Sequence, residues 1–557
     1  MDRRRAYPSL NVVTIIVKAI VRVFSRPKRT TKHEAPEERK KRRVPLALPG
    51  LRRRRKRGEF CITLAETIAD PRGAAVGPQT SWIARLPNEI LLEIFDCHRL
   101  ATLDNSSDTW KWHRLAHVCQ RWRLLIFESP RCLDLRLVYT YKNPLRKSLE
   151  LWPVLPVAVR YPKSTLHRRL APDDEQNVLA VLKHSSRICE IDLPMTRQLV
   201  SKSASSMNAS FPILQRLQVR SQELMRPITL PIEFLGKSSP LLRDIHLIRT
   251  TFPTLPQLLS SAQALVSLQI EDIPNAGYFS PERLVISMSG MAQLRTLKIR
   301  FLPPNIHERS MDASPINRTI LPALTEFDFK GNCEYAEDLV SRLDAPALGK
   351  INVTFLEQPT FGIPRLARFV GRTKEAKSPH HTIVRLSDEI TITQHFRRPS
   401  CTASASGTFQ LQIPCEDLDR QVPLLIHVCR YLSDPLSGVE RFDIETYSRS
   451  SWNEGEELDT GVWLELFRAL RGAKRLEVSG GLVTNIASAL ERVTGEMARS
   501  VFPALRDLHL LDWESPASTS TSIEPFIAAR QLCGRPVAVH YEKEESLDHS
   551  TSGSEDD

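Results

Sequence analysis

Most of the chain, from about residue 133 to residue 540, carries short runs in which apolar and polar residues alternate. Each run has the form Leu-x-x-Leu-x-Leu or a close variant, as in Leu214 to Val219 and Leu242 to Leu247. Alternation with a period of two predicts a β-strand that buries one face. Segments between the runs, such as Thr254 to Ala264, have the apolar spacing of short helices. The pattern therefore predicts strands and helices in alternation.

The runs recur at a nearly constant interval. The first seven have their central apolar residues at positions 191, 217, 245, 268, 297, 327 and 351, which are 23 to 30 residues apart, and three later runs centre on 442, 476 and 508. This interval is typical of leucine-rich repeats, whose stacked units bury a continuous core and leave one face open. We predict an α/β fold with an irregular leucine-rich-repeat-like solenoid over residues 136 to 541. The alternative is an α/β protein whose strands are merely rich in leucine.

The interval breaks between residues 353 and 439, and we interpret residues 354 to 438 as an irregular insertion. Two segments inside it alternate like strands, Thr382 to Phe396 and Thr408 to Pro414. Three polar segments are predicted to be loops: residues 303 to 320, 371 to 381 and 397 to 407.

Residues 82 to 130 follow a different pattern. Leu86 precedes a proline and is expected to be extended, and Pro87 suits the first position of a helix. Apolar residues with helical spacing follow at positions 90, 91, 94 and 95. A second helix is expected to carry Leu115, Val118 and Cys119, and a third to carry Trp122, Leu125 and Ile126. The pattern predicts a three-helix module over residues 81 to 135, which is small for an independent core.

The net charge of +13 comes from one end of the chain. Residues 1 to 60 contain 20 Lys and Arg against 5 Asp and Glu, so the remaining 497 residues have a net charge of −2. Blocks of like charge repel one another, which predicts a disordered basic arm over residues 1 to 80. Residues 542 to 557 are acidic and rich in serine, and predict a disordered tail.

Two clusters in the basic arm fit a bipartite nuclear-import signal. They consist of Arg39, Lys40, Lys41, Arg42 and Arg43, followed by Arg52, Arg53, Arg54, Arg55, Lys56 and Arg57. The same clusters support an alternative function, a nuclear nucleic-acid-associated or chromatin-associated repeat protein. No aromatic residues alternate with the basic runs to stack on bases, so nucleic acid is the weaker interpretation. The expected location is the cytoplasm, the nucleus or both.

Other chemistry is not indicated. The ten cysteines are scattered and form no Cys-x-x-Cys pair, a pattern of reduced thiols rather than of a disulfide framework. His113, His117 and Cys119 are close in sequence but have no evident fourth ligand for zinc. No stretch is apolar over the roughly 18 residues that a membrane helix requires. We predict no catalytic residues, no cofactor, no metal site and no membrane partner.

The three-helix module resembles the F-box. The resemblance rests on Leu86-Pro87-x-Glu89-Ile90-Leu91-x-x-Ile94-Phe95, followed by Val118-Cys119-x-x-Trp122-Arg123. The arrangement of module and repeats resembles the expanded F-box family of mushroom-forming fungi. The resemblance implies a non-enzymatic substrate receptor for ubiquitin-dependent degradation. Such a receptor binds a Skp-type adaptor on a cullin scaffold through its F-box, and an unidentified target protein through its repeats.

The resemblance also implies which residues contact the adaptor. Carried over by position, they are Leu86, Pro87, Ile90, Leu91, Ile94, Phe95, Leu115, Val118 and Trp122. The alternative for several of them is that they hold the three helices together.

Overall fold

The computed structural model describes the following residues: 85–101, 115, 118–128, 136–139, 149–150, 155–161, 171–223, 226–303, 318–357, 362–373, 379–396, 407–415, 418–432, 436, 438–446, 460–511 and 516–542. The chain divides into two compact units, Met1–Leu135 and Arg136–Asp557. The basic arm, with the predicted import signal, lies outside the described residues, as does the tail after Glu542.

The second unit is built on one sheet of sixteen strands, in the order β1-β2-β3-β4-β6-β8-β9-β11-β13-β16-β15-β14-β17-β18-β19-β20. All neighbouring strands are parallel except for the β16–β15 and β15–β14 pairs. The strands are β1 (Leu137–Tyr139), β2 (Val157–Arg160), β3 (Ile188–Met195), β4 (Arg216–Ser221), β6 (Asp244–Ile248), β8 (Ser267–Ile273), β9 (Thr296–Phe301), β11 (Glu326–Gly331), β13 (Lys350–Phe355), β14 (Pro379–Leu386), β15 (Glu389–Phe396), β16 (Gly407–Pro414), β17 (Arg441–Thr446), β18 (Arg475–Ser479), β19 (Asp507–Leu511) and β20 (Ala538–Glu542).

The repeated apolar residues form one row across this sheet. Ile191 pairs with Leu217, Leu217 with Ile245 and Ile245 with Leu268, and the same register continues through residues 297, 327 and 351. The later centres, 442, 476 and 508, are likewise direct partners. All of these side chains are at most 2% exposed. The sequence repeat is therefore a structural repeat, with one strand for each unit.

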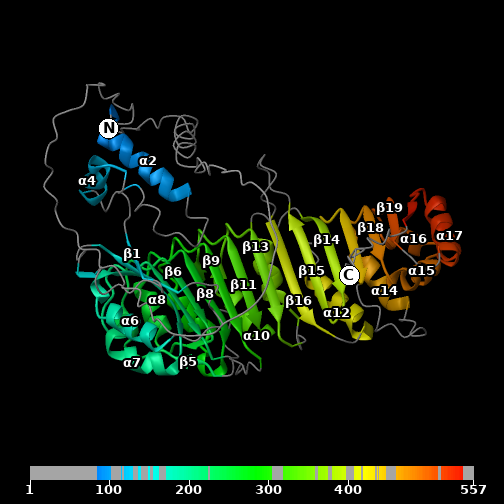
Figure 1. Ribbon diagram of the computed structural model, residues 1–557. Helices are drawn as coiled ribbons and strands as arrows, with labels where there is room; N and C mark the ends of the chain where they lie inside the picture. Colours follow the sequence, from blue (N-terminus) through cyan, green and yellow to red (C-terminus); the bar gives the residue numbers. More distant parts are fainter. Residues whose placement is uncertain are drawn as a thin grey trace, which may run out of the picture. The chain divides into compact units, whose positions relative to one another are not determined.

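Helices between the strands cover one face of the sheet (Figure 1). They are α6 (Pro172–Leu182), α7 (Arg197–Met207), α8 (Leu255–Ser261), α9 (Pro281–Ser287), α10 (Cys333–Ser341), α11 (Pro364–Arg372), α12 (Leu418–Tyr431), α14 (Thr460–Ala469), α15 (Leu482–Glu491), α16 (Met497–Ser500) and α17 (Pro516–Leu532). Proline begins α6, α9 and α11, a position where its missing N–H costs nothing. Two further pairs of short strands lie outside the main sheet: β5 (Ile228–Thr229) with β7 (Thr250–Thr251), and β10 (Thr319–Ile320) with β12 (Leu343–Asp344).

The segment expected to be an irregular insertion supplies three strands of the same sheet. β14 and β15 form an antiparallel hairpin, and β16 runs parallel to β13, so the sheet continues without a break. All three loop predictions were wrong at their ends. Gly371 and Arg372 end α11, Pro379 to His381 begin β14, Gly407 begins β16, and Thr319 and Ile320 form β10. The strand residues are extended because they pair with neighbouring strands, an effect of tertiary context on β-structure. Residues 374 to 378, 397 to 406 and 304 to 317 lie outside the described residues.

In the first unit, the structure describes two helices, α2 (Asn88–Ala101) and α4 (Gln120–Glu128). Pro87 stands one residue before α2, and its carbonyl accepts the N–H of Leu91 at 3.1 Å. Leu115 is helical, but Val118 and Cys119, expected in the same helix, lie in the turn before α4. The Cys119 thiol explains this, since Sγ accepts the Trp122 N–H at 3.5 Å at the start of α4. None of the described helices combines the length and apolar character needed to cross a membrane.

Candidate interaction surfaces

The core of the helical module comes from apolar residues that lie one helical turn apart on each described helix. Leu91, Ile94 and Phe95 of α2 are at most 7% exposed, and Trp122 of α4 is 5% exposed. The Phe95 and Trp122 rings meet edge to face, with centroids 4.7 Å apart, a favourable geometry for aromatic pairs. Leu115 is buried as well. In the structure, these five of the nine predicted contact residues hold the module together.

The other predicted contact residues are accessible. Ile90 is 37% exposed and Val118 is 43% exposed, while Pro87 is exposed and Leu86 is half-buried. Ile90 lies beside the buried stripe of α2, where an apolar side chain gains little unless a partner covers it. These four accessible residues of the predicted contact set stand at or before the starts of the two described helices, and together we call them the helix-start surface.

Sequence reasoning missed two features of the module. Leu124 of α4 is 50% exposed, and its helical spacing from Trp122, Leu125 and Ile126 places it on the opposite side of α4. That spacing could have identified it. The second feature is Arg121, whose Nη2 donates to the Leu86 carbonyl at 2.5 Å and to Asn88 Oδ1 at 2.7 Å, with Nε 3.2 Å from Asn88 Oδ1. No local sequence pattern predicts a contact between residues that are 33 to 35 positions apart.

The second unit presents the open face of its sheet, the face away from the helices. Charged residues on this face are paired between neighbouring strands. Arg160 donates to both Glu190 carboxylate oxygens at 2.7 Å, and Arg300 donates to both oxygens of Asp328 at 2.8 Å. Bidentate pairs of this kind are among the strongest side-chain hydrogen bonds. Further pairs are Arg220–Asp192, Lys350–Glu326, Arg385–Glu445 and Arg441–Glu477.

This alternation of acid and base gives the described part of the open face a mixed charge. A nucleic-acid-binding surface requires a basic stripe or patch that faces the phosphates. Here many of the arginines and lysines that project from the strands face carboxylates instead. The described part of the open face therefore does not present the unpaired basic stripe that phosphate recognition requires.

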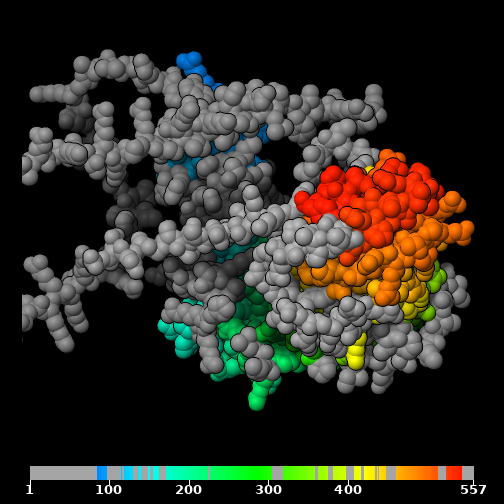
Figure 2. Space-filling view, turned by 90° about the vertical axis from the view of Figure 1, so that its right-hand side faces the viewer, coloured from blue at the N-terminus to red at the C-terminus, as the bar shows by residue number. Residues whose placement is uncertain are grey.

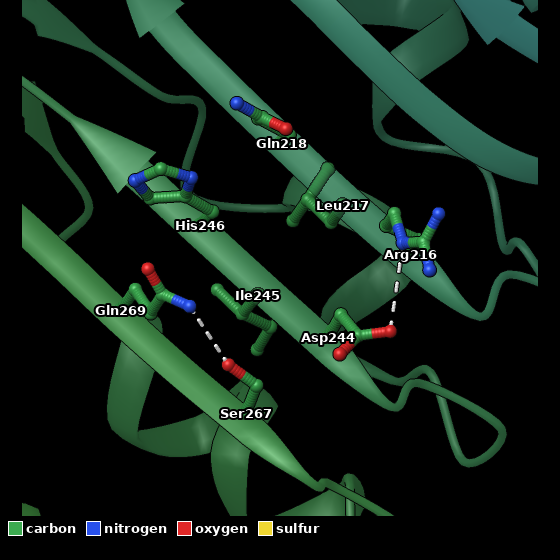
Figure 3. Close-up of a pocket in the computed structure, with 8 residues that line it drawn as sticks. All are labelled: Arg216, Leu217, Gln218, Asp244, Ile245, His246, Ser267 and Gln269. Carbon is green, nitrogen blue, oxygen red and sulfur yellow. Dashed lines mark hydrogen bonds and ion pairs between the residues drawn. The ribbon is translucent and has the colours of Figure 1, made fainter. Parts of the chain in front are cut away.

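A shallow hollow lies on the open face between β4, β6 and β8. Figure 3 shows its lining, which comprises Arg216, Leu217, Gln218, Asp244, Ile245, His246, Ser267 and Gln269. Arg216 Nε lies 3.5 Å from Asp244 Oδ2, and Gln269 Nε2 donates to Ser267 Oγ at 3.0 Å. Amide, imidazole, guanidinium and carboxylate groups meet here, so the hollow can hydrogen-bond a polar side chain of a partner. Among the described residues, no group of three or more His, Cys, Asp and Glu is placed to hold a metal ion.

Glu271, in the second half of β8, is a carboxylate of the open face with a strongly lowered pKa. His246 Nε2 lies 2.9 Å from Glu271 Oε1, and Lys298 Nζ lies 3.0 Å from Oε2. The hydrogen bond with His246 and then that with Lys298 outweigh burial and lower the pKa of Glu271 to about 2. A carboxyl with a lowered pKa in the folded state stabilises the fold above its unfolded pKa of about 4.3. That contribution is lost as the pH falls through about 2.

We expect Glu271→Gln to lower the free energy of unfolding by about 1–2 kcal/mol at pH 6.5, after allowance for solvent screening. The difference from the wild type should shrink below pH 4 and vanish near pH 2. Urea unfolding at several pH values measures it. The matched control is Glu326→Gln, since Glu326 pairs with Lys350 at 2.8 Å but its side chain is 36% exposed, against 19% for Glu271. The control should change stability by less than about 0.5 kcal/mol. Equal effects of the two variants at every pH would contradict the stabilising role of the Glu271 carboxylate.

The chain thus combines a small helical module that exposes apolar residues with a repeat array that exposes a polar sheet face. Residues 83–131 match the family model described as F-box-like. The chain therefore contains an F-box-like domain, and this domain coincides with the helical module. No curated protein matches the sequence.

Proposed function

We propose that this protein is the substrate-receptor subunit of a cullin–RING ubiquitin ligase. The F-box-like domain binds a Skp-type adaptor, and the repeat array, a leucine-rich-repeat-like domain over residues 136 to 541, binds a target protein. The observation that carries the proposal is the F-box-like match at residues 83–131, over a module that leaves Ile90 and Val118 exposed. In this proposal the basic arm serves nuclear import, and the protein acts in the nucleus, the cytoplasm or both.

A receptor of this kind contributes proximity rather than chemistry. Holding a target lysine beside the ubiquitin carrier raises its effective concentration, which speeds transfer without a catalytic residue on the receptor. The two compact units suit this division of labour, because each presents a surface of its own: apolar on the module, polar on the sheet. The proposed result is degradation of the target.

The adaptor contact is tested by placing a charge on the helix-start surface of the full chain. Ile90→Glu should weaken binding to the host's Skp-type adaptor by on the order of 30-fold or more, since a buried unpaired charge in an apolar contact costs at least about 2 kcal/mol. The accessible position of Ile90 means that the module itself should still fold. Isothermal titration of the purified chain against the adaptor measures the affinity, and the Leu86→Ala/Pro87→Ala double variant provides a second lesion of the same surface.

The matched control is Ile232→Glu, which makes the same change at an isoleucine of the second unit that is 64% exposed. It should bind the adaptor like the wild type. Absence of binding by a folded wild-type chain would sink the receptor proposal. Binding that Ile90→Glu leaves intact would move the contact away from the helix-start surface.

A further inference from the structure

A side chain of α4 connects the start of that helix to the start of α2. Arg121, the second residue of α4, reaches back to the segment that leads into α2. Its guanidinium donates to the Leu86 carbonyl at 2.5 Å and to Asn88 Oδ1 at 2.7 and 3.2 Å. The first hydrogen bond inside α2 runs from Leu91 N–H to the Pro87 carbonyl. The Leu86 carbonyl precedes that bond and lies outside the helix, so Arg121 satisfies an acceptor that the helix does not.

We propose that Arg121 is a positioning residue for the adaptor surface. This inference rests on the proposed receptor function. Arg121 follows Val118 by three residues and bonds the residues on either side of Pro87, so it brings the exposed apolar residues of both helix starts to the same end of the module. In its absence, the Leu86–Pro87 segment loses this attachment to α4. The adaptor would then have to order this segment on binding, which lowers affinity.

The geometry suits arginine specifically. A guanidinium is a planar fork that can donate to a carbonyl and an amide oxygen at once, whereas a lysine ammonium is a point charge on a flexible stem. Arg121→Lys should therefore keep the positive charge but only part of the hydrogen bonding to the Leu86 carbonyl and Asn88 Oδ1. Arg121→Met removes the hydrogen bonds to both acceptors while it preserves the length of the side chain and its helix propensity.

The test compares adaptor affinities of full-length variants by titration. Arg121→Met should weaken adaptor binding about 10-fold, and Arg121→Lys about 3-fold. In a Leu86→Ala/Pro87→Ala background, Arg121→Met should weaken binding less than 3-fold further, because a positioning residue loses its effect once the surface that it positions is gone. Arg283→Met, at an exposed arginine in the first turn of α9, is the charge-matched control and should leave the affinity unchanged.

The outcomes separate this inference from the proposed function. If the wild-type chain does not bind the adaptor, the proposed function fails and the inference fails with it. If the wild type binds and Arg121→Met binds equally well, the receptor function stands and the positioning role is overturned. An effect of full size in the double-variant background would show that Arg121 acts independently of the Leu86–Pro87 segment, which also overturns it. Limited proteolysis serves as the folding control. If Arg121→Met is cleaved faster than the wild type but Arg121→Lys is not, the 3-fold loss of adaptor affinity in Arg121→Lys decides whether Arg121 has the positioning role.

Discussion

Replacing Trp122 with alanine is expected to unfold the F-box-like module while the repeat array stays folded. The indole is 5% exposed and packs edge to face on Phe95, with centroids 4.7 Å apart, so it joins α4 to α2. Loss of a buried tryptophan costs about 3–5 kcal/mol. A unit of this size has about that much stability in total. Because the repeat array is a separate compact unit with its own core, the damage should stay local.

Limited proteolysis of the full chain measures this effect, with the cleavage sites mapped by mass spectrometry. In Trp122→Ala, cleavage should appear within α2 and α4 while the strands from β3 to β9 remain protected, and adaptor binding should be lost. The matched control is Leu124→Ala on the same helix, where the side chain is 50% exposed. It should change stability by no more than about 0.5 kcal/mol. A Trp122→Ala module as resistant as the wild type would contradict the described core.

Arg530→Ala should destabilise the C-terminal end of the repeat array by about 3–5 kcal/mol. Arg530 lies in the last turn of α17, coloured red in Figure 2, and is 1% exposed. Its Nη1 donates to the Ala498 carbonyl of α16 at 3.0 Å, and its Nη2 donates to the Leu505 carbonyl ahead of β19 at 2.9 Å. Burial lowers the pKa of Arg530. Alanine would leave two buried carbonyls without a donor and would also open a cavity.

Urea unfolding of Arg530→Ala measures the loss of unfolding free energy, with Arg535→Ala as the control. Arg535 also donates to two backbone carbonyls, those of Arg499 and Pro503, at 3.4 and 3.2 Å, but in exposed positions. Water replaces such bonds readily, so the control should cost less than about 1 kcal/mol. Arg530→Met should fall between the two, since it restores volume but no hydrogen bonds. Equal stability of Arg530→Ala and Arg535→Ala would show that the buried guanidinium does not hold the end of the array together.

The strands of the regular repeats were predictable from the sequence, whereas the position of the β14–β15 hairpin in the sheet was not. The strand centres from Ile191 to Ile351 were predictable because a side chain that is buried once per repeat must be apolar once per repeat. A different local rule, the backbone restriction that proline imposes, predicted the start of the first helix at Pro87, one residue before α2 begins at Asn88. By contrast, the hairpin of β14 and β15 places Thr382 and Gln394, both fully buried, in the row that apolar residues occupy elsewhere. A pattern of apolar residues cannot identify such strands as part of the same row, which is why this segment was interpreted as an irregular insertion.

For the helical module, the sequence determined that Leu86 to Trp122 belong to one small helical unit and that these residues are mostly apolar. Only the tertiary structure decided which of them are core and which are surface, since burial depends on how two helices face each other. It buries Leu91, Phe95 and Trp122 and leaves Ile90 and Val118 exposed.

For the repeat array, the sequence by itself determined an α/β architecture with one strand for each repeat, because local periodicity encodes strands and helices. The pairing of charges across the open face and the connection from Arg121 to Leu86 join residues that are distant in the chain. Side-chain hydrogen bonds and ion pairs of this kind depend on distances of about 3 Å between atoms. Only the packing of the whole unit sets such distances.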